Sequence, residues 1–192
     1  MTNLPTLTTA RLILKLPEEN CAKLMRNFVV ENKAHLSFWE PLQADDYYTE
    51  NYWKKKIEEI RGDFLSDKSC CLNIYEKETS ELIGMINFNN FIRGAFHSCF
   101  LGFKISQQAQ GRGLMTEALQ AALQYLFQKL NLHRVSANYM PNNQASARVL
   151  GKCGFKKEGI AEDYLCIAGK WERHVLTGLV NSSWRGNTSS ES

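Results

Sequence analysis

Two glycines, Gly111 and Gly113, stand between a strand-like run and the clearest amphipathic helix in the sequence. Glycine reaches backbone conformations that other residues avoid, and it lets the main chain approach a ligand closely. The first turn of a helix offers free N–H groups and the positive end of the helix dipole. The apolar stripe that defines this helix recurs every three or four residues, at Met115, Ala118, Leu119, Ala122, Leu123, Leu126 and Leu130. This order of elements predicts a loop that holds a pyrophosphate.

Two familiar phosphate loops do not fit this segment. A Walker loop continues from its last glycine with Lys and then Ser or Thr, where this chain has Leu114 and Met115. A dinucleotide-binding loop needs a third glycine at the position of Thr116. The loop by itself also leaves open an ordinary strand-to-helix turn that binds no ligand.

Apolar periodicity along the chain predicts an α+β domain with a central mixed, mostly antiparallel, twisted sheet flanked by helices. We expect residues 1–10 to form an N-terminal strap, 11–180 the domain, and 181–192 a loosely ordered polar tail. The expected strands lie near 12–16, 71–75, 82–88, 96–105, 134–139, 157–167 and 171–180, and the expected helices near 18–36, 49–65, 114–130 and between Asn143 and Gly154.

Composition and charge argue against several classes of protein. No apolar run approaches the roughly 20 residues that cross a bilayer, and the first residues do not resemble a secretory signal. We therefore expect a cytoplasmic protein with no membrane partner. A net charge of +3 is too small to indicate nucleic-acid binding by itself, so no sequence-specific nucleic-acid contact is expected. The six cysteines include no Cys-x-x-Cys pair, which predicts reduced thiols and no metal site. Adjacent Cys70 and Cys71 should point to opposite faces of a strand.

The pattern Gln108-x-x-Gly111-x-Gly113 before an amphipathic helix resembles the acetyl-CoA loop of the GNAT superfamily of N-acetyltransferases. Two further segments support the resemblance. Asn143-x-x-Ser146, followed by Gly154-Phe155, resembles an Asn-x-x-Ser…Gly-Phe signature of that superfamily. The run from Thr9 to Leu14 resembles the opening of its ribosomal-protein acetyltransferase branch. The resemblance implies the acyl-CoA N-acyltransferase fold and acetyl-CoA as co-substrate.

The resemblance to that branch extends to segments 39–41, 91–97, 133–141 and 163–165. It implies an acceptor, the N-terminal alanine of a small-subunit ribosomal protein. Two alternatives stay open at this point. One is an acetyltransferase for a small-molecule amine or an antibiotic on the same fold. The other is a non-catalytic acetyl-CoA-binding protein or ribosome-assembly factor.

The resemblance also implies roles for individual residues. Asn143 would hydrogen-bond the pantetheine arm, and Ser146 would lie near the sulfur and protonate the departing thiolate. Either residue is also a good helix N-cap, so capping is the alternative role for both. The remaining cofactor contacts would come from main-chain groups, those of Phe103 and Ile105 for the pantetheine arm and those of Gln110, Gly111, Arg112, Gly113 and Leu114 for the pyrophosphate.

A general base is harder to place. Many members of the superfamily keep a glutamate at the position where this chain has Phe100. Asp163 is our first candidate for the base. The other candidates are Glu162, Glu40 and His97. We expect Trp39 and Glu40 to contact the acceptor. Phe38, Phe91 and Phe96 are further candidates to line the acceptor channel, but we expect their side chains to pack in the core.

The identity of the acceptor bears on how strong a base is needed. An α-amino group titrates near 7.7–8.0, whereas a lysine amine titrates near 10.4. Deprotonation at neutral pH therefore costs about 1 kcal/mol for the α-amine and on the order of 3–4 kcal/mol for lysine. A chain without the usual glutamate is easier to reconcile with a protein N-terminus than with lysine.

Overall fold

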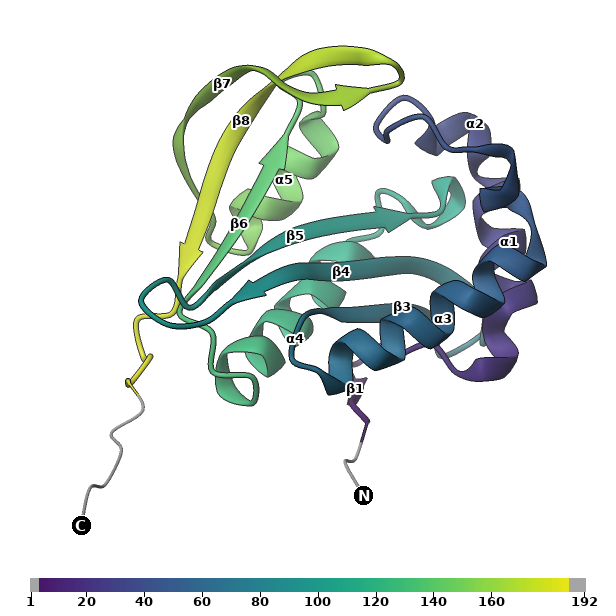
Figure 1. Cartoon of the computed structure of the whole chain (residues 1–192), viewed down its shortest axis with the longest axis horizontal. Coiled ribbons are helices and arrows are strands. Elements are labelled where there is room, and N and C mark those ends of the chain that lie inside the picture. Colours follow the sequence, from purple (N-terminus) through teal and green to yellow (C-terminus); the bar gives the residue numbers. More distant parts are fainter. Residues whose placement is uncertain (1–3, 187–192) are drawn as a thin grey trace.

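The computed structural model describes residues 4–186, which form an eight-stranded sheet with helices on both faces (Figure 1). The strand order is β1-β2-β3-β4-β5-β6-β8-β7. The strands are β1 (Thr6–Thr8), β2 (Leu12–Lys15), β3 (Cys70–Glu76), β4 (Leu82–Ile92), β5 (Ser98–Ile105), β6 (Arg134–Tyr139), β7 (Lys156–Ile167) and β8 (Lys170–Val180). The α-helices are α1 (Ala22–Glu31), α2 (Lys33–Leu36), α3 (Glu50–Leu65), α4 (Leu114–Gln128) and α5 (Gln144–Lys152), and the 3-10 helices are η1 (Glu19–Cys21), η2 (Asp45–Tyr48) and η3 (Gln107–Ala109).

The sheet is mixed and mostly antiparallel. Within residues 4–186 every pair of neighbouring strands is antiparallel except β5 with β6. The predicted α+β class is therefore confirmed. Strand β1 was not predicted. It lies in the expected strap and pairs with β2 at the edge of the sheet, from Thr6 opposite Lys15 to Thr8 opposite Ile13.

A single helix over 18–36 was also predicted, but Asn32 divides it into α1 and α2. The Asn32 Nδ2 group donates a hydrogen bond to the carbonyl of Phe28 at 2.9 Å. Its Oδ1 atom accepts one from the backbone N–H of Gln107 at 3.0 Å. A side chain that binds its own backbone competes with the helix. Here the same side chain also ties the helical layer to the segment after β5.

The two faces of the sheet differ in character. On β4, Ile86 and Phe88 are fully buried in the core, whereas Asn87 and Asn89 point to the opposite face because side chains alternate along a strand. The Cys70 thiol lies near Tyr125 of α4, and the Cys71 thiol lies near Lys56 of α3. The predicted opposite orientation of these cysteines is confirmed. Helix α4 covers one face and α3 the other, and no helix within residues 4–186 is long and apolar enough to cross a membrane.

The N-terminal segment is fastened to α4 through Glu117. Thr9 Oγ1 donates to Glu117 Oε1 at 2.6 Å, and Arg11 Nε donates to Glu117 Oε2 at 2.7 Å. A second nitrogen of the same guanidinium, Nη1, donates to the carbonyl of Arg112 at 3.0 Å. Burial alone would raise the pKa of Glu117, but the hydrogen bonds from Thr9 and Arg11 outweigh it and lower that pKa. One carboxylate thus joins the strap, the residue that precedes β2 and the start of α4.

The beginning of the expected polar tail is ordered against the body of the protein. The Asn181 backbone N–H donates to the carbonyl of His133 at 2.8 Å, and Trp184 Nε1 donates to that of Asn131 at 3.2 Å. The Trp184 ring also packs edge-on against His97 and His133. The expectation of loose order is therefore wrong for 181–184. Residues 187–192 of the tail lie outside the described part of the chain.

We predict that Glu117→Gln lowers the free energy of unfolding by about 1–2 kcal/mol at pH 7, because charge-assisted hydrogen bonds are lost at a partly exposed site. The folded-state pKa of Glu117 lies below its ordinary value of 4.5, so its contribution is present above that pH and is lost as the pH falls below it. The difference between wild type and Glu117→Gln should shrink accordingly in urea titrations at pH 7, 5 and 3. Glu78→Gln, in the exposed β3–β4 turn, serves as the control and should change stability little at any of these values. A deficit for Glu117→Gln that does not vary with pH would contradict the assignment.

Candidate active site

The sheet opens between its two central parallel strands. Strands β5 and β6 pair from Ser98 opposite Arg134 to Leu101 opposite Ala137, and then separate. Beyond this point β5 continues to pair with β4 as far as Ile105, and β6 continues to pair with β8 as far as Tyr139. The two halves of the sheet therefore form a V (Figure 1). The edge of β5 from Gly102 onwards is free of β6 and can offer main-chain groups to a ligand.

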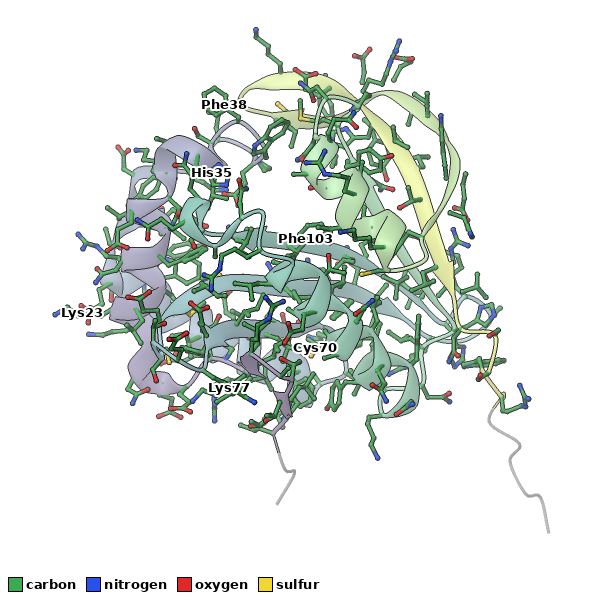
Figure 2. The ribbon with its side chains drawn as sticks, turned by 180° about the vertical axis from the view of Figure 1, so that it is seen from behind. Lys23, His35, Phe38, Cys70, Lys77 and Phe103 are labelled. Carbon is green, nitrogen blue, oxygen red and sulfur yellow. The ribbon has the colours of Figure 1, made fainter. Side chains whose placement is uncertain are left out.

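A cavity of about 150 Å³ lies at this opening. Leu101 and Phe103 contribute one face of β5 to it, and Gly102 contributes the other, so the cavity passes through the sheet rather than lying on one side. In the view from behind, Phe103 is near the middle of the molecule (Figure 2). The cavity brings together four residues that the sequence singled out, namely Trp39, Phe103, Asn143 and Ser146.

The glycine loop has the conformation expected of an anion-binding loop. Gly111 and Gly113 have φ of +73° and +77°, and Gly113 is the N-cap of α4, whose first turn has no side-chain cap. A Cβ atom at Gly111 would meet nothing within 4 Å, so the backbone angle, not crowding, calls for glycine there. The Arg112 guanidinium is held by Glu76 at 2.5 Å. The loop therefore presents its backbone to a ligand, and free N–H groups at a helix start fit a pyrophosphate.

The loop is also held from its outer side. The Gln110 side-chain amide nitrogen lies 2.9 Å from Nε2 of His35 on α2. Figure 2 shows His35 at the side of the molecule that the N-terminal helices form. Leu114, the first residue of α4, is fully buried. Ile105 ends β5 just before the loop and is partly buried against the core. The predicted cofactor residues on β5 and in the loop thus lie on consecutive segments next to the opening.

The structure separates the roles of Asn143 and Ser146. Asn143 is the N-cap of α5, and its Oδ1 atom accepts a hydrogen bond from the backbone N–H of Ser146 at 3.0 Å. The Ser146 hydroxyl has no hydrogen-bond partner within residues 4–186. Of the two capping alternatives, the one for Asn143 is correct and the one for Ser146 is not. Both side chains line the cavity.

The two acidic candidates on β7 lie away from the cavity lining. The Glu162 carboxylate accepts a hydrogen bond from Arg173 Nε at 2.7 Å, and its side chain is 64% exposed. Asp163 is exposed, with φ of +44°, at an irregularity in the β7–β8 register between Ala161 and Leu165. Neither residue is among those that line the cavity.

Glu40 is tied to a buried lysine. Lys104 Nζ lies 2.6 Å from Glu40 Oε1 and donates to the Tyr47 hydroxyl at 3.0 Å. Burial alone would lower the pKa of Lys104, but Glu40 and Tyr47 outweigh it and raise that pKa. The Glu40 carboxylate therefore neutralises Lys104 rather than standing free. Its neighbour Trp39 lines the cavity.

The segment that carries Trp39 and Glu40 reaches across the V. The backbone N–H of Ala168, in the β7–β8 turn, donates to the carbonyl of Glu40 at 3.0 Å. Figure 1 shows the segment after α2 approaching the β7–β8 turn above the opening. The segment therefore joins the two halves of the sheet over the cavity.

Several aromatic and basic candidates lie elsewhere. His97 precedes β5, roughly 13 Å along the strand from Leu101, and its ring packs against Trp184. Phe38 and Phe96 are 69% and 48% exposed, so the expected core packing is wrong for both. Phe91 packs partly buried against the core, as expected. Phe100, in the position of the usual glutamate, is 37% exposed on the open face of β5.

Three residues of this site were not singled out from the sequence. Asn138 Nδ2 donates to the Tyr164 hydroxyl at 3.0 Å, and the Tyr164 ring packs against that of His174. His174 is 3% exposed, and its Nδ1 atom lies 2.9 Å from the carbonyl of Glu172. A carbonyl only accepts, so Nδ1 is the donor of this hydrogen bond, and a ring protonated at Nδ1 alone presents Nε2 as an acceptor. Asn138 and His174 both line the cavity.

Comparison with known proteins agrees with this geometry. The family model described as "Acetyltransferase (GNAT) domain" matches residues 11–156. The chain is 39% identical over 178 residues to the "[Ribosomal protein uS5]-alanine N-acetyltransferase" of Escherichia coli (strain K12). The aligned region covers 93% of this chain and 92% of that protein. It is 37% identical over 151 residues to the "Probable N-acetyltransferase YjcK" of Bacillus subtilis (strain 168), covering 79% of this chain and 83% of that protein.

Solved structures agree as well. The "Ribosomal-protein-S5-alanine Acetyltransferase" from Vibrio fischeri superposes with a TM-score of 0.91 at 30% identity, covering 94% of this chain and 99% of that chain. "Mycobacterium smegmatis RimJ in complex with CoA-disulfide" superposes with a TM-score of 0.84 at 25% identity, covering 92% and 86%. The family match and the identity along nearly the whole chain show that this chain belongs to the GNAT acetyltransferase family, whose members transfer an acetyl group from acetyl-CoA to an amine.

Proposed function

We propose that this enzyme acetylates the α-amine of an N-terminal alanine on a small-subunit ribosomal protein. The observation that carries the proposal is the cavity through the sheet, which Ser146 of α5 lines. On the open face of β5, Phe100 stands where many members of the superfamily have a glutamate that acts as general base. The names of the relatives from E. coli and V. fischeri state the same acceptor for those proteins. A ribosomal-protein acceptor would place the enzyme in the cytoplasm.

The donor would enter from the face of the sheet that α4 covers. Backbone N–H groups from Gly111 to Leu114 would hold the pyrophosphate, and the main chain of Phe103 and Ile105 the pantetheine arm. The expected N–H of Gln110 drops out of this set, because it donates to the carbonyl of Gln107 at 3.3 Å. The Asn143 Oδ1 atom caps α5, which leaves its Nδ2 group to donate to that arm. Acetyl-CoA supplies the activated acetyl group when it is bound.

The reaction forms an N–C bond and breaks the C–S bond of the thioester. We propose that the Ser146 hydroxyl donates a proton to the departing sulfur, and that the amine gives up its own proton to a base or to water. Asp163, with Glu162 beside it, stays our predicted proton acceptor, and it would act through water from the exposed strand β7. His174 is added as a second candidate, because it lines the cavity and its Nε2 atom is an acceptor. A weak base suffices for an α-amine.

The alternative of a polycationic small-molecule acceptor is disfavoured by charge. A second, larger cavity on the acceptor side has a single carboxylate in its lining, that of Asp63, and three lysines, of which Lys56 and Lys104 are paired with glutamates outside the lining. A pocket for polyamines needs the opposite balance. Only a turnover assay with acetyl-CoA distinguishes an enzyme from the alternative of a non-catalytic binding protein.

We predict that Gly111→Asp weakens acetyl-CoA binding about tenfold or more relative to Gly111→Asn. Both side chains tolerate positive φ comparatively well, so the pair differs mainly in a negative charge beside the pyrophosphate, which is worth about 1–3 kcal/mol. Calorimetric titration with acetyl-CoA measures the difference. Gly94→Asp is the control, because Gly94 has a similar φ of +69° in a remote turn, and it should leave the dissociation constant unchanged. Equal affinities for the two Gly111 variants would remove the loop from the site.

We predict that Ser146→Ala lowers kcat by roughly 10²-fold while changing the free energy of unfolding by less than about 0.5 kcal/mol, because its hydroxyl caps nothing. Asn143→Ala is the structural comparison, since loss of the α5 cap costs about 0.5–2 kcal/mol. Steady-state kinetics and urea unfolding of both variants test these roles. A normal kcat for Ser146→Ala would exclude it as the proton donor.

We predict that the enzyme acetylates a peptide with a free N-terminal alanine in preference to the same peptide with that amine blocked and one lysine open. The rate should rise with pH through the titration of the amine near 8, because a weak base leaves the reaction dependent on the neutral fraction. Mass spectrometry identifies the modified amine. Preference for the lysine of the blocked peptide would overturn the acceptor assignment, and absence of turnover with every amine would favour a binding protein.

A further inference from the structure

The larger cavity, of about 560 Å³, lies between α3 and the face of β3 and β4 that α4 does not cover. Helix α3 crosses in front of these strands (Figure 1). Its volume falls in the range of about 300–1,000 Å³ that is typical of ligand sites. Neither the donor loop nor the proton-transfer groups proposed above belong to it, so it has no role in the chemistry described so far.

The larger cavity adjoins the smaller one, because residues on neighbouring strands line the two. Asn87 lines the larger cavity and lies directly opposite Gly102, which lines the smaller cavity. A Cβ atom at Gly102 would meet nothing within 4 Å, so the surface between the two cavities is open. The segment after α2 also serves both, because Trp39 lines the smaller cavity and Gln43 the larger. A chain whose amine lies in the smaller cavity can therefore continue into the larger.

Two of the four asparagines that line the larger cavity, Asn87 and Asn89, give it its recognition chemistry. Asn87 and Asn89 are two residues apart on β4, so they share a face and lie about 6.7 Å apart. That distance equals the separation of alternate peptide groups in an extended chain. A carboxamide both donates and accepts, as a peptide group does. Within residues 4–186 neither side-chain amide has a hydrogen-bond partner.

The charges around the cavity do not favour an ionic ligand. Lys56 is paired with Glu59 at 2.9 Å, and Lys104 is paired with Glu40 at 2.6 Å. Lys68 and Asp63 make no ion pair within the part of the chain that the structure describes, and their opposite charges balance. A phosphate or a polyamine would gain little here, whereas a neutral polypeptide backbone would find unpaired amide groups.

We propose that the larger cavity binds the residues that follow the first residue of the acceptor protein, as an extended chain whose peptide groups pair with Asn87 and Asn89. This inference rests on the proposed function, because it assumes that the acceptor is a protein N-terminus. Main-chain recognition is then the source of selectivity beyond the first residue. The enzyme then selects an acceptor whose N-terminal segment is unfolded, and the identity of the later side chains matters little.

The test compares an alanine-first dipeptide amide with an alanine-first hexapeptide amide by kcat/KM. In the wild type the hexapeptide should be the better acceptor. The hexapeptide-to-dipeptide ratio should fall about 3- to 10-fold in Asn89→Ala and again in the Asn87→Ala/Asn89→Ala double variant, because each loses hydrogen bonds to the peptide. Asn51→Ala, an exposed asparagine of α3 outside both cavities, should keep the wild-type ratio. Calorimetric binding of acetyl-CoA identifies the variants that are folded.

Modified peptides separate main-chain from side-chain recognition. N-methylation of the third or fourth peptide bond should reduce kcat/KM for the hexapeptide towards the value for the dipeptide. Replacement of the residues at positions 3 to 6 by alanine should leave kcat/KM unchanged. A wild-type ratio near one, or a ratio that survives in both asparagine variants, overturns the peptide groove and leaves the proposed function intact. Absence of N-terminal acetylation with either peptide overturns both.

Discussion

The parallel pairing of β5 with β6, and its end at Leu101 and Ala137, is the constraint on which the site depends. Parallel neighbours need a crossover connection, which here is α4. Each of the two strands is therefore followed by a loop and a helix at the same edge of the sheet, and ligands bind at that edge in open sheets. The glycine loop after β5 and the Asn143 cap after β6 meet there as a consequence. The early separation of the strands converts the edge into a passage through the sheet.

The passage needs a fixed loop beside it, and the N-terminal segment supplies the support. Arg11 binds Glu117 in α4 and the carbonyl of Arg112 in the loop, while Glu76 holds the Arg112 side chain. Charged groups thus surround the loop from outside and leave its inner backbone free. A loop held in this way loses little conformational freedom when an anion binds, which favours affinity. The edge strand β1 supports the loop indirectly, because it keeps Thr9 next to Glu117 of α4.

Local patterns in the sequence predicted most of the fold. The stripe from Met115 to Leu126 and the two glycines are short-range signals, and the α+β order follows from them and from the alternating strands. Strand β1 has three residues, too few to show alternation. The break at Asn32 depends on Gln107, far along the chain. The sequence could not separate Asn143 from Ser146 as caps, because both residue types cap helices. The Glu40–Lys104 pair and the Tyr164–His174 contact are tertiary, and no local spacing predicts them.

The segment of residues 38–44, which joins the two halves of the sheet over the cavity, has a further consequence for how the molecule fluctuates. On the β7–β8 side it is held by the hydrogen bond from Ala168 to Glu40 and by Leu42 close to Gly169, and Leu42 is 76% exposed. Segments with few buried contacts open at low free energy, separately from the core strands. We therefore expect the amide hydrogens of 38–44 to exchange with solvent through local opening, and those of β4 and β5 only through global unfolding. A segment that opens separately from the strands beside the cavity would let the site admit a polypeptide while the sheet stays folded.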